Sequence, residues 1–420
     1  MTGVRNLPPT SCEARLSEVV RASHGRILAT LCARTRDISG AEDALATAYR
    51  SALETWAEQG VPDKPEAWLL TAARNQLTDR ARSAYTRTST SLHHSNGEVM
   101  ELAMPHSNDD DEVPDERLKL MFAAAHPALD ASVRAPLVMQ TVLGMEASEI
   151  ARIFVVPVAT MAQRLVRAKT KIRDAGIPFV VPGQDVWPER LEYVLEAIYG
   201  AYSAGLEQPT DPTDERGGEA LYLADMLATL LPEEPEALGL ASLICFSASR
   251  AGARYNESGE LVPLNQQDVT RWDRTLIAQA SRQLASASTH GTTGRFQLEA
   301  AVHAVHADRR RTGRTDWRAI LQLYEGLLSM APTYGLIVAR AYAISQYVSL
   351  SAGLAALSPL SDEEIEGFAP ALLLRAHLHE QHEARRAAAS DYERAALLLP
   401  EGQEKQHAQR KAERIRATLV

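Results

Sequence analysis

The chain has 420 residues, of which 45% are hydrophobic and 23% are charged, and its formal net charge is −10. This is the composition of a globular protein of roughly two to three domains, and it excludes collagen-like and low-complexity chains and a general nucleic-acid coat protein. The three cysteines share no C-x-x-C spacing, and no signal-like or long apolar segment stands out, so we expect a cytoplasmic protein without disulfides or a membrane span.

Helical periodicity dominates the chain and strand-like alternation is almost missing, so we expect an all-α fold. Residues 10–85 predict a compact group of three helices. The second of these begins at a capping box formed by Ser39 and Glu42 and continues through Trp56. The third has Pro65 in its first turn, where proline is well tolerated.

The third predicted helix has an aromatic and polar face that suits single-stranded nucleic acid. Arginine and asparagine side chains beside a tryptophan stack on unpaired bases and bond to them. An amphipathic helix with a core tryptophan explains the same residues, and on these residues alone it is the favoured interpretation. The candidate contacts are Trp68, Arg74, Asn75, Asp79 and Arg82.

Residues 86–115 predict a flexible linker. The window 96–116 contains eight acidic residues and no lysine or arginine, and no apolar periodicity marks a helix or strand there. An acidic segment repels phosphate, so we expect it to connect nucleic-acid-binding parts rather than to bind DNA itself.

Residues 116–178 predict a helix-turn-helix. The first helix spans 147–154, and Pro157 stops it and helps to start the second. The packed face of the second helix consists of Met161, Leu165, Ala168 and Ile172. Its opposite face, which suits the major groove of DNA, carries Thr160, Gln163, Arg164, Arg167 and Lys171. A solvated helix face is the alternative, since helix-turn-helix patterns also occur in proteins that do not bind DNA.

Residues 186–420 predict a long helical extension, interrupted by a loop rich in proline and glycine at 207–218. Tyr324-Glu325 and Tyr392-Glu393 each precede a proline by the same interval and lie 68 residues apart, twice the tetratricopeptide period. Stacked helical hairpins of this kind offer a concave surface for a protein or peptide partner. An inert extension that only stabilises the chain is the alternative.

No enzyme motif stands out in the sequence. The segment HLHEQHE contains His377, His379 and His382 but lacks the H-E-x-x-H spacing, so a solvated helix surface is favoured over a metal site. Phosphate-binding and nucleophile-elbow motifs are missing as well. We therefore expect neither catalysis nor a metal or cofactor.

Taken together, these segments resemble a known family. The residues that carry the resemblance are AEDALATAYRSALETW, PEAWLLTAARNQLTDRAR and EIARIFVVPVATMAQRLVRAKTKIRDAGIPFVVP, with LPEEPEALGLASL and TDWRAILQLYEGLLSMAP in the extension. The chain resembles the extracytoplasmic-function sigma factors of bacterial RNA polymerase, in the subgroup with a tetratricopeptide-like C-terminal extension.

The resemblance implies a role for each part of the chain. Residues 10–85 would be the region-two domain, which binds core RNA polymerase and reads the minus-ten promoter element, and 116–178 the region-four domain, which reads the minus-thirty-five element. The polymerase-facing residues would be Glu42, Asp43, Tyr49 and Trp56. The partners implied are the polymerase core and promoter DNA, with a protein or peptide on the extension. A helix-turn-helix regulator or repeat scaffold that does not bind polymerase is the alternative.

Overall fold

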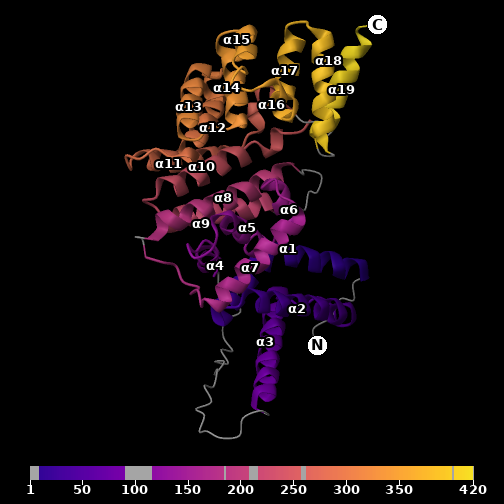
Figure 1. Ribbon diagram of the computed structural model, residues 1–420, viewed down its shortest axis with the longest axis vertical. Helices are drawn as coiled ribbons and strands as arrows, with labels where there is room; N and C mark the ends of the chain where they lie inside the picture. The colour runs from indigo at the N-terminus through magenta and orange to yellow at the C-terminus, as the bar shows by residue number, and fades with distance from the viewer. Residues whose placement is uncertain are drawn as a thin grey trace. The chain divides into compact units, whose positions relative to one another are not determined.

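The structure, a computed structural model, describes residues 9–89, 116–183, 186–207, 216–256, 262–399 and 402–419. All regular elements in these segments are helices, which confirms the predicted all-α fold (Figure 1). Contacts divide the chain into two compact units, residues 1–205 with 209–220 and residues 206–208 with 221–420. None of the described helices is both long and apolar enough to span a membrane. The predicted acidic linker lies outside the described residues, except for 86–89, which continue the third helix.

The first unit begins with the three predicted helices, α1 (Pro9–Thr35), α2 (Ile38–Gln59) and α3 (Pro65–Ser89). Asp37 occupies the N-cap position of α2, so the predicted capping box at Ser39 is wrong and Ser39 lies inside the helix. The buried face of α2 consists of Ile38, Ala41, Ala44, Leu45, Ala48, Ala52 and Trp56.

The same unit continues with five helices that carry the predicted helix-turn-helix. Asp130 caps the second of them by accepting a 2.8 Å hydrogen bond from the Ser132 amide. Pro136 lies inside this helix and does not end it. The helices are α4 (Arg117–Ala124), α5 (Ala131–Thr141), α6 (Ala147–Ile153), α7 (Val158–Asp174) and α8 (Trp187–Glu207).

The two predicted DNA-binding domains pack against each other within this unit. Helix α1 contacts α4 and α5, and α2 contacts α7. Gly25 makes the approach of α1 possible, because a Cβ atom at this position would lie only 1.9 Å from the carbonyl oxygen of Val142. The helix groups 10–85 and 116–178 are therefore parts of one compact body in this conformation.

Helix α8 packs with the helices that precede it. The ring of Trp187 stacks on that of Phe122, with the centroids 6.5 Å apart. Beyond α8, the ion pair between Arg117 and Glu219 spans 2.5 Å, and the two side chains are only 8% and 16% exposed. Most of α8 therefore belongs to the same compact unit as the helices that precede it.

The second unit is a series of helices in which neighbours along the chain pack side by side, as Figure 1 shows for α17, α18 and α19. From α14 to α19 the helices bury small and branched apolar residues against one another. Short 3-10 turns at Ala251–Ala253, Leu264–Gln266 and Val269–Arg271 connect α10 to α11. The helices are α9 (Arg216–Leu230), whose residues up to 220 belong to the first unit, α10 (Pro235–Ala248), α11 (Arg274–Ser288), α12 (Arg295–Thr312), α13 (Trp317–Met330), α14 (Tyr334–Tyr347), α15 (Leu350–Ala355), α16 (Asp362–Glu366), α17 (Ala369–Gln381), α18 (Arg385–Leu398) and α19 (Gln403–Ala417).

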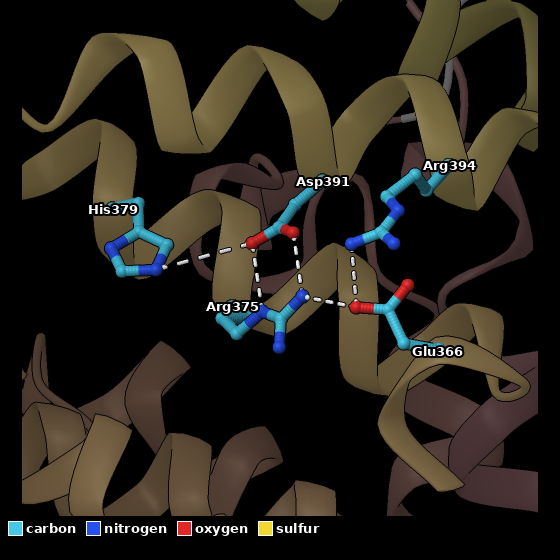
Figure 2. Close-up of polar contacts among 5 residues, drawn as sticks. All are labelled: Glu366, Arg375, His379, Asp391 and Arg394. Carbon is cyan, nitrogen blue, oxygen red and sulfur yellow. Dashed lines mark hydrogen bonds and ion pairs between the residues drawn. The ribbon is translucent and has the colours of Figure 1, made fainter. Parts of the chain in front are cut away.

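An ion-pair cluster joins α16, α17 and α18 (Figure 2). Arg375 binds Asp391 through two hydrogen bonds of 2.7 and 2.8 Å and reaches Glu366 at 3.2 Å. Arg394 also donates to Glu366, at 2.6 Å, and His379 lies 4.0 Å from Asp391. Because the side chain of Asp391 is only 7% exposed, its charge is stabilised mainly by Arg375. The cluster therefore links α16, α17 and α18 through their charged side chains.

Candidate nucleic-acid interface

The helix-turn-helix is formed by α6, a tight turn and α7. The amide of Val156 donates to the carbonyl of Ala151 at 3.0 Å, which closes the end of α6. Val155 takes the left-handed conformation, with φ 51°, and its side chain is exposed. Pro157 then precedes α7 with its carbonyl bound to the amide of Met161 at 3.1 Å. The predicted turn is confirmed, with a β-branched residue where glycine is favoured.

At the start of α6, Glu146 occupies the N-cap position. Its amide donates a 3.0 Å hydrogen bond to the carboxylate of Glu149, three residues later. The side chain of Glu146 in turn faces the backbone amide of Glu149, which completes a capping box. The two contacts satisfy backbone donors that a helix start leaves unpaired. The first helix of the motif is thus capped without a serine or threonine.

Helix α7 divides into a buried and an exposed face, as its periodicity predicts. The predicted packed residues Met161, Leu165, Ala168 and Ile172 are at most 5% exposed. On the other face Gln163, Arg167 and Lys171 are exposed, and Thr160 and Arg164 are half-buried. Arg164 also lies near Asp130, where its charge contributes to lowering the pKa of that carboxyl, after the hydrogen bonds from Ser132. One face of α7 therefore presents amide, hydroxyl and guanidinium groups to solvent together.

The residues predicted to contact melted DNA lie along α3. Asn75, Asp79 and Arg82 are exposed, whereas Trp68 and Arg74 are half-buried. Burial and the neighbouring charge of Arg34 lower the pKa of the Arg74 guanidinium. At the base of this helix, Glu66 accepts hydrogen bonds from Ser23 and Arg26 of α1. Polar contacts thus hold the N-terminal end of α3 against α1. The polar side chains farther along the helix are the accessible ones.

The residues predicted to face polymerase separate into two groups. Asp43 is exposed and pairs with Arg80 of α3 at 3.3 Å. Trp56, by contrast, is only 2% exposed, and its ring meets the edge of Trp68 with the centroids 5.5 Å apart. The expectation of a partner contact at Trp56 is therefore corrected to a role in packing α2 on α3. The physical reason is that an indole of this size fills the core between two helices.

Glu42 and Tyr49, the other two predicted polymerase contacts, are half-buried at the junction of the two helix groups. Glu42 accepts hydrogen bonds of 2.6 and 2.7 Å from the ammonium of Lys169 in α7. The Tyr49 hydroxyl lies 3.2 Å from Nδ1 of His24 in α1. Burial, with a contribution from the Lys169 charge, lowers the pKa of His24 to about 4.

This junction contains two residues that sequence reasoning missed. Lys169 belongs to the cationic stretch of α7, but its side chain is only 9% exposed, so it contacts α2 rather than solvent. Its position one residue after the packed Ala168 is the signal that could have placed it at the edge of the buried face. No local signal marks His24, because its partner Tyr49 lies on another helix.

Comparison with known proteins agrees with this geometry. Residues 119–172, which include α6 and all but the last two residues of α7, match the family model for sigma-70, region 4. Residues 190–288 match a family of unknown function, DUF6596. The uncharacterized protein R00370 of Rhizobium meliloti (strain 1021) is 33% identical over 374 residues, which cover 88% of each chain. No solved structure matches the chain. The chain therefore belongs to one family with this Rhizobium meliloti protein, and its residues 119–172 are a sigma-70 region-4 domain whose exposed cationic face on α7 suits a sigma-factor-like DNA-binding role.

Proposed function

We propose that the chain is an RNA polymerase sigma factor of the extracytoplasmic-function type, which directs promoter recognition and has no catalysis of its own. The exposed face of α7 carries this proposal, because it places Gln163 and Arg167 on a helix of a region-4 match. Glutamine pairs well with adenine and arginine with guanine in the major groove, and Lys171 suits a phosphate. The target of this face is the minus-thirty-five promoter element.

In the same proposal the first three helices serve as the region-two domain. The exposed Asn75, Asp79 and Arg82 contact the melted minus-ten element, and Asp43 contacts the polymerase core. Two weakly binding DNA contacts on one chain reinforce each other through their high effective concentration. The second unit, proposed as a tetratricopeptide-like extension, has a regulatory or partner-binding role.

Run-off transcription with purified core polymerase tests the proposal. The full chain should support initiation from its own promoter, and Arg167→Ala should lower that promoter's affinity by about 5-fold to 150-fold, the effect of about 1–3 kcal/mol at one base. Arg173→Ala is the matched control, because Arg173 is exposed on the same helix, pairs with Asp174 and lies off the proposed reading face. Equal losses in the two variants would indicate a general charge effect without base reading.

The alternative function is a helix-turn-helix regulator or repeat scaffold that does not bind polymerase. Co-purification with core polymerase separates the two functions, because a free regulator needs neither α2 nor α3 for DNA binding. The sigma proposal predicts that Asp43→Ala weakens co-purification while DNA binding of α7 is retained. A chain that binds its promoter but neither co-purifies with polymerase nor supports run-off would establish the alternative.

A further inference from the structure

The second unit contains a cavity of about 1010 Å³ whose walls come from well-separated parts of the chain. Helices α12, α13, α14 and α17 line one side, and α18 and α19 line another. The segment 262–266 forms a further wall. A space of this size is in the range that holds a small organic ligand.

Four aromatic rings follow one another along the wall. His306 meets Trp317 and Trp317 meets Tyr342 at right angles, with centroid distances of 5.5 Å in both pairs, and Tyr342 lies 6.4 Å from His377. All four rings line the cavity and are half-buried, so they keep part of their surface open to it. Ring edges and faces in this arrangement favour a planar apolar ligand.

The charged groups that line the cavity are all basic. Arg410, Lys411 and Arg414 come from one face of α19, and no aspartate or glutamate lies among the described lining residues. Glu380 stands behind them and binds both Lys411, at 2.9 Å, and Arg414, at 3.1 Å. One carboxylate against two of these cations leaves an excess of positive charge at this end of the cavity.

The two histidines of the aromatic wall are shifted toward their neutral form, mainly by burial. Burial lowers the pKa of His306 to about 4, with contributions from the charges of Arg250 and Arg309. Burial also lowers the pKa of His377, with a contribution from the charge of Lys411. At neutral pH the wall is therefore uncharged while the α19 end is cationic. The cavity has an apolar aromatic part and a basic part.

The wall opposite the helices is held in place. The amide of Val262 donates to the carbonyl of Arg254 at 2.8 Å. Arg309 of α12 donates to the carbonyl of Gln267 at 3.0 Å and lies over the ring of Trp272, 5.2 Å from its centroid. These contacts anchor one end of the wall to the turn that ends at Arg254 and the other end to α12, so the chamber is formed before a ligand arrives.

We propose that this chamber binds a small organic anion with a planar aromatic body, and that the second unit thereby acts as a ligand-binding module. The rings between His306 and His377 hold the planar body, and Lys411 and Arg414 hold a carboxylate or phosphate. Charge complementarity and the limited volume of the cavity favour such a ligand over a long extended peptide. The site is independent of promoter recognition by α7.

Matched naphthalene probes test the site on the full chain. We expect 2-naphthoate and 2-naphthyl phosphate to bind with one site per chain in calorimetry, at least 10-fold tighter than 2-naphthamide and with no detectable binding of 2-naphthylmethylamine. Trp317→Leu should weaken all binding probes at least 10-fold. Lys411→Gln should remove the advantage of the anions while the binding of the amide remains.

Arg416→Gln is the control for charge, since Arg416 lies on α19 outside the cavity and pairs with Glu393. Circular dichroism of each variant establishes that the helices are retained. Anions that bind no better than the amide, or unchanged binding in the Trp317→Leu variant with its helices intact, would overturn the proposal. So would an acidic peptide containing phenylalanine that binds more than 10-fold tighter than 2-naphthoate, because it would identify a peptide groove.

Discussion

The ion pair between Glu42 and Lys169 gives the sharpest test of the packing of α2 on α7. Replacement of Glu42 by alanine leaves an ammonium that is only 9% exposed without a partner, whereas replacement of Lys169 by methionine leaves a carboxylate that is 27% exposed and open to water. The two substitutions should therefore lower the free energy of unfolding by clearly different amounts, although they remove the same ion pair.

The magnitudes follow from distance and burial. Unit charges 2.6 Å apart attract by about 6 kcal/mol at an effective dielectric constant of about 20, and the desolvation of the lysine offsets most of this. The orphaned ammonium makes Glu42→Ala cost about 3 kcal/mol of unfolding free energy, and Lys169→Met about 1 kcal/mol. The double variant should lose about 2 kcal/mol, because its second change removes the buried charge.

Hydrogen exchange of the full chain measures these losses locally. Peptides from α2 and α7, followed by mass spectrometry at increasing urea, report the opening free energy of the first unit separately from that of the second. Glu58→Ala, at an exposed glutamate of α2, should change this free energy by less than about 0.5 kcal/mol. Equally small losses for Glu42→Ala and Lys169→Met would refute the packed junction.

Three other local features lead to predictions. Val155→Gly should stabilise the chain by about 1 kcal/mol, because glycine adopts φ 51° without a steric cost, and a thermal midpoint that does not rise would contradict strain at the turn. Asp391→Ala should cost about 3 kcal/mol by leaving Arg375 without its bidentate partner, seen as faster exchange in α17 and α18 but not in α7. The pKa of His24 is lowered to about 4, so the folded state resists its protonation, and its contribution to stability is lost as pH falls from 6.5 to 4. Over that range the parent chain should lose about 3 kcal/mol more than His24→Asn in urea unfolding; parallel curves would argue against a buried neutral imidazole.

Local patterns predicted most of the helices and one face of the candidate site. The turn at Pro157, the packed stripe from Met161 to Ile172 and the exposed Arg167 follow from neighbours three or four residues apart, which share a helix face in any fold. The predicted start of α2 at Ser39 is wrong, because Asp37 and Ser39 are both suitable N-caps and Asp37 occupies the position.

Tertiary contacts determine how the helix groups 10–85 and 116–178 pack against each other. Lys169 pairs with Glu42, and Trp56 packs inward against Trp68 instead of facing a partner. Both contacts depend on helices that meet only after folding. The aromatic wall and the basic end of the cavity likewise combine residues from His306 to Arg414. The helical period dictates which side of a helix is apolar, but the identity of its neighbour is set by packing among distant segments, and burial and charge depend on that neighbour.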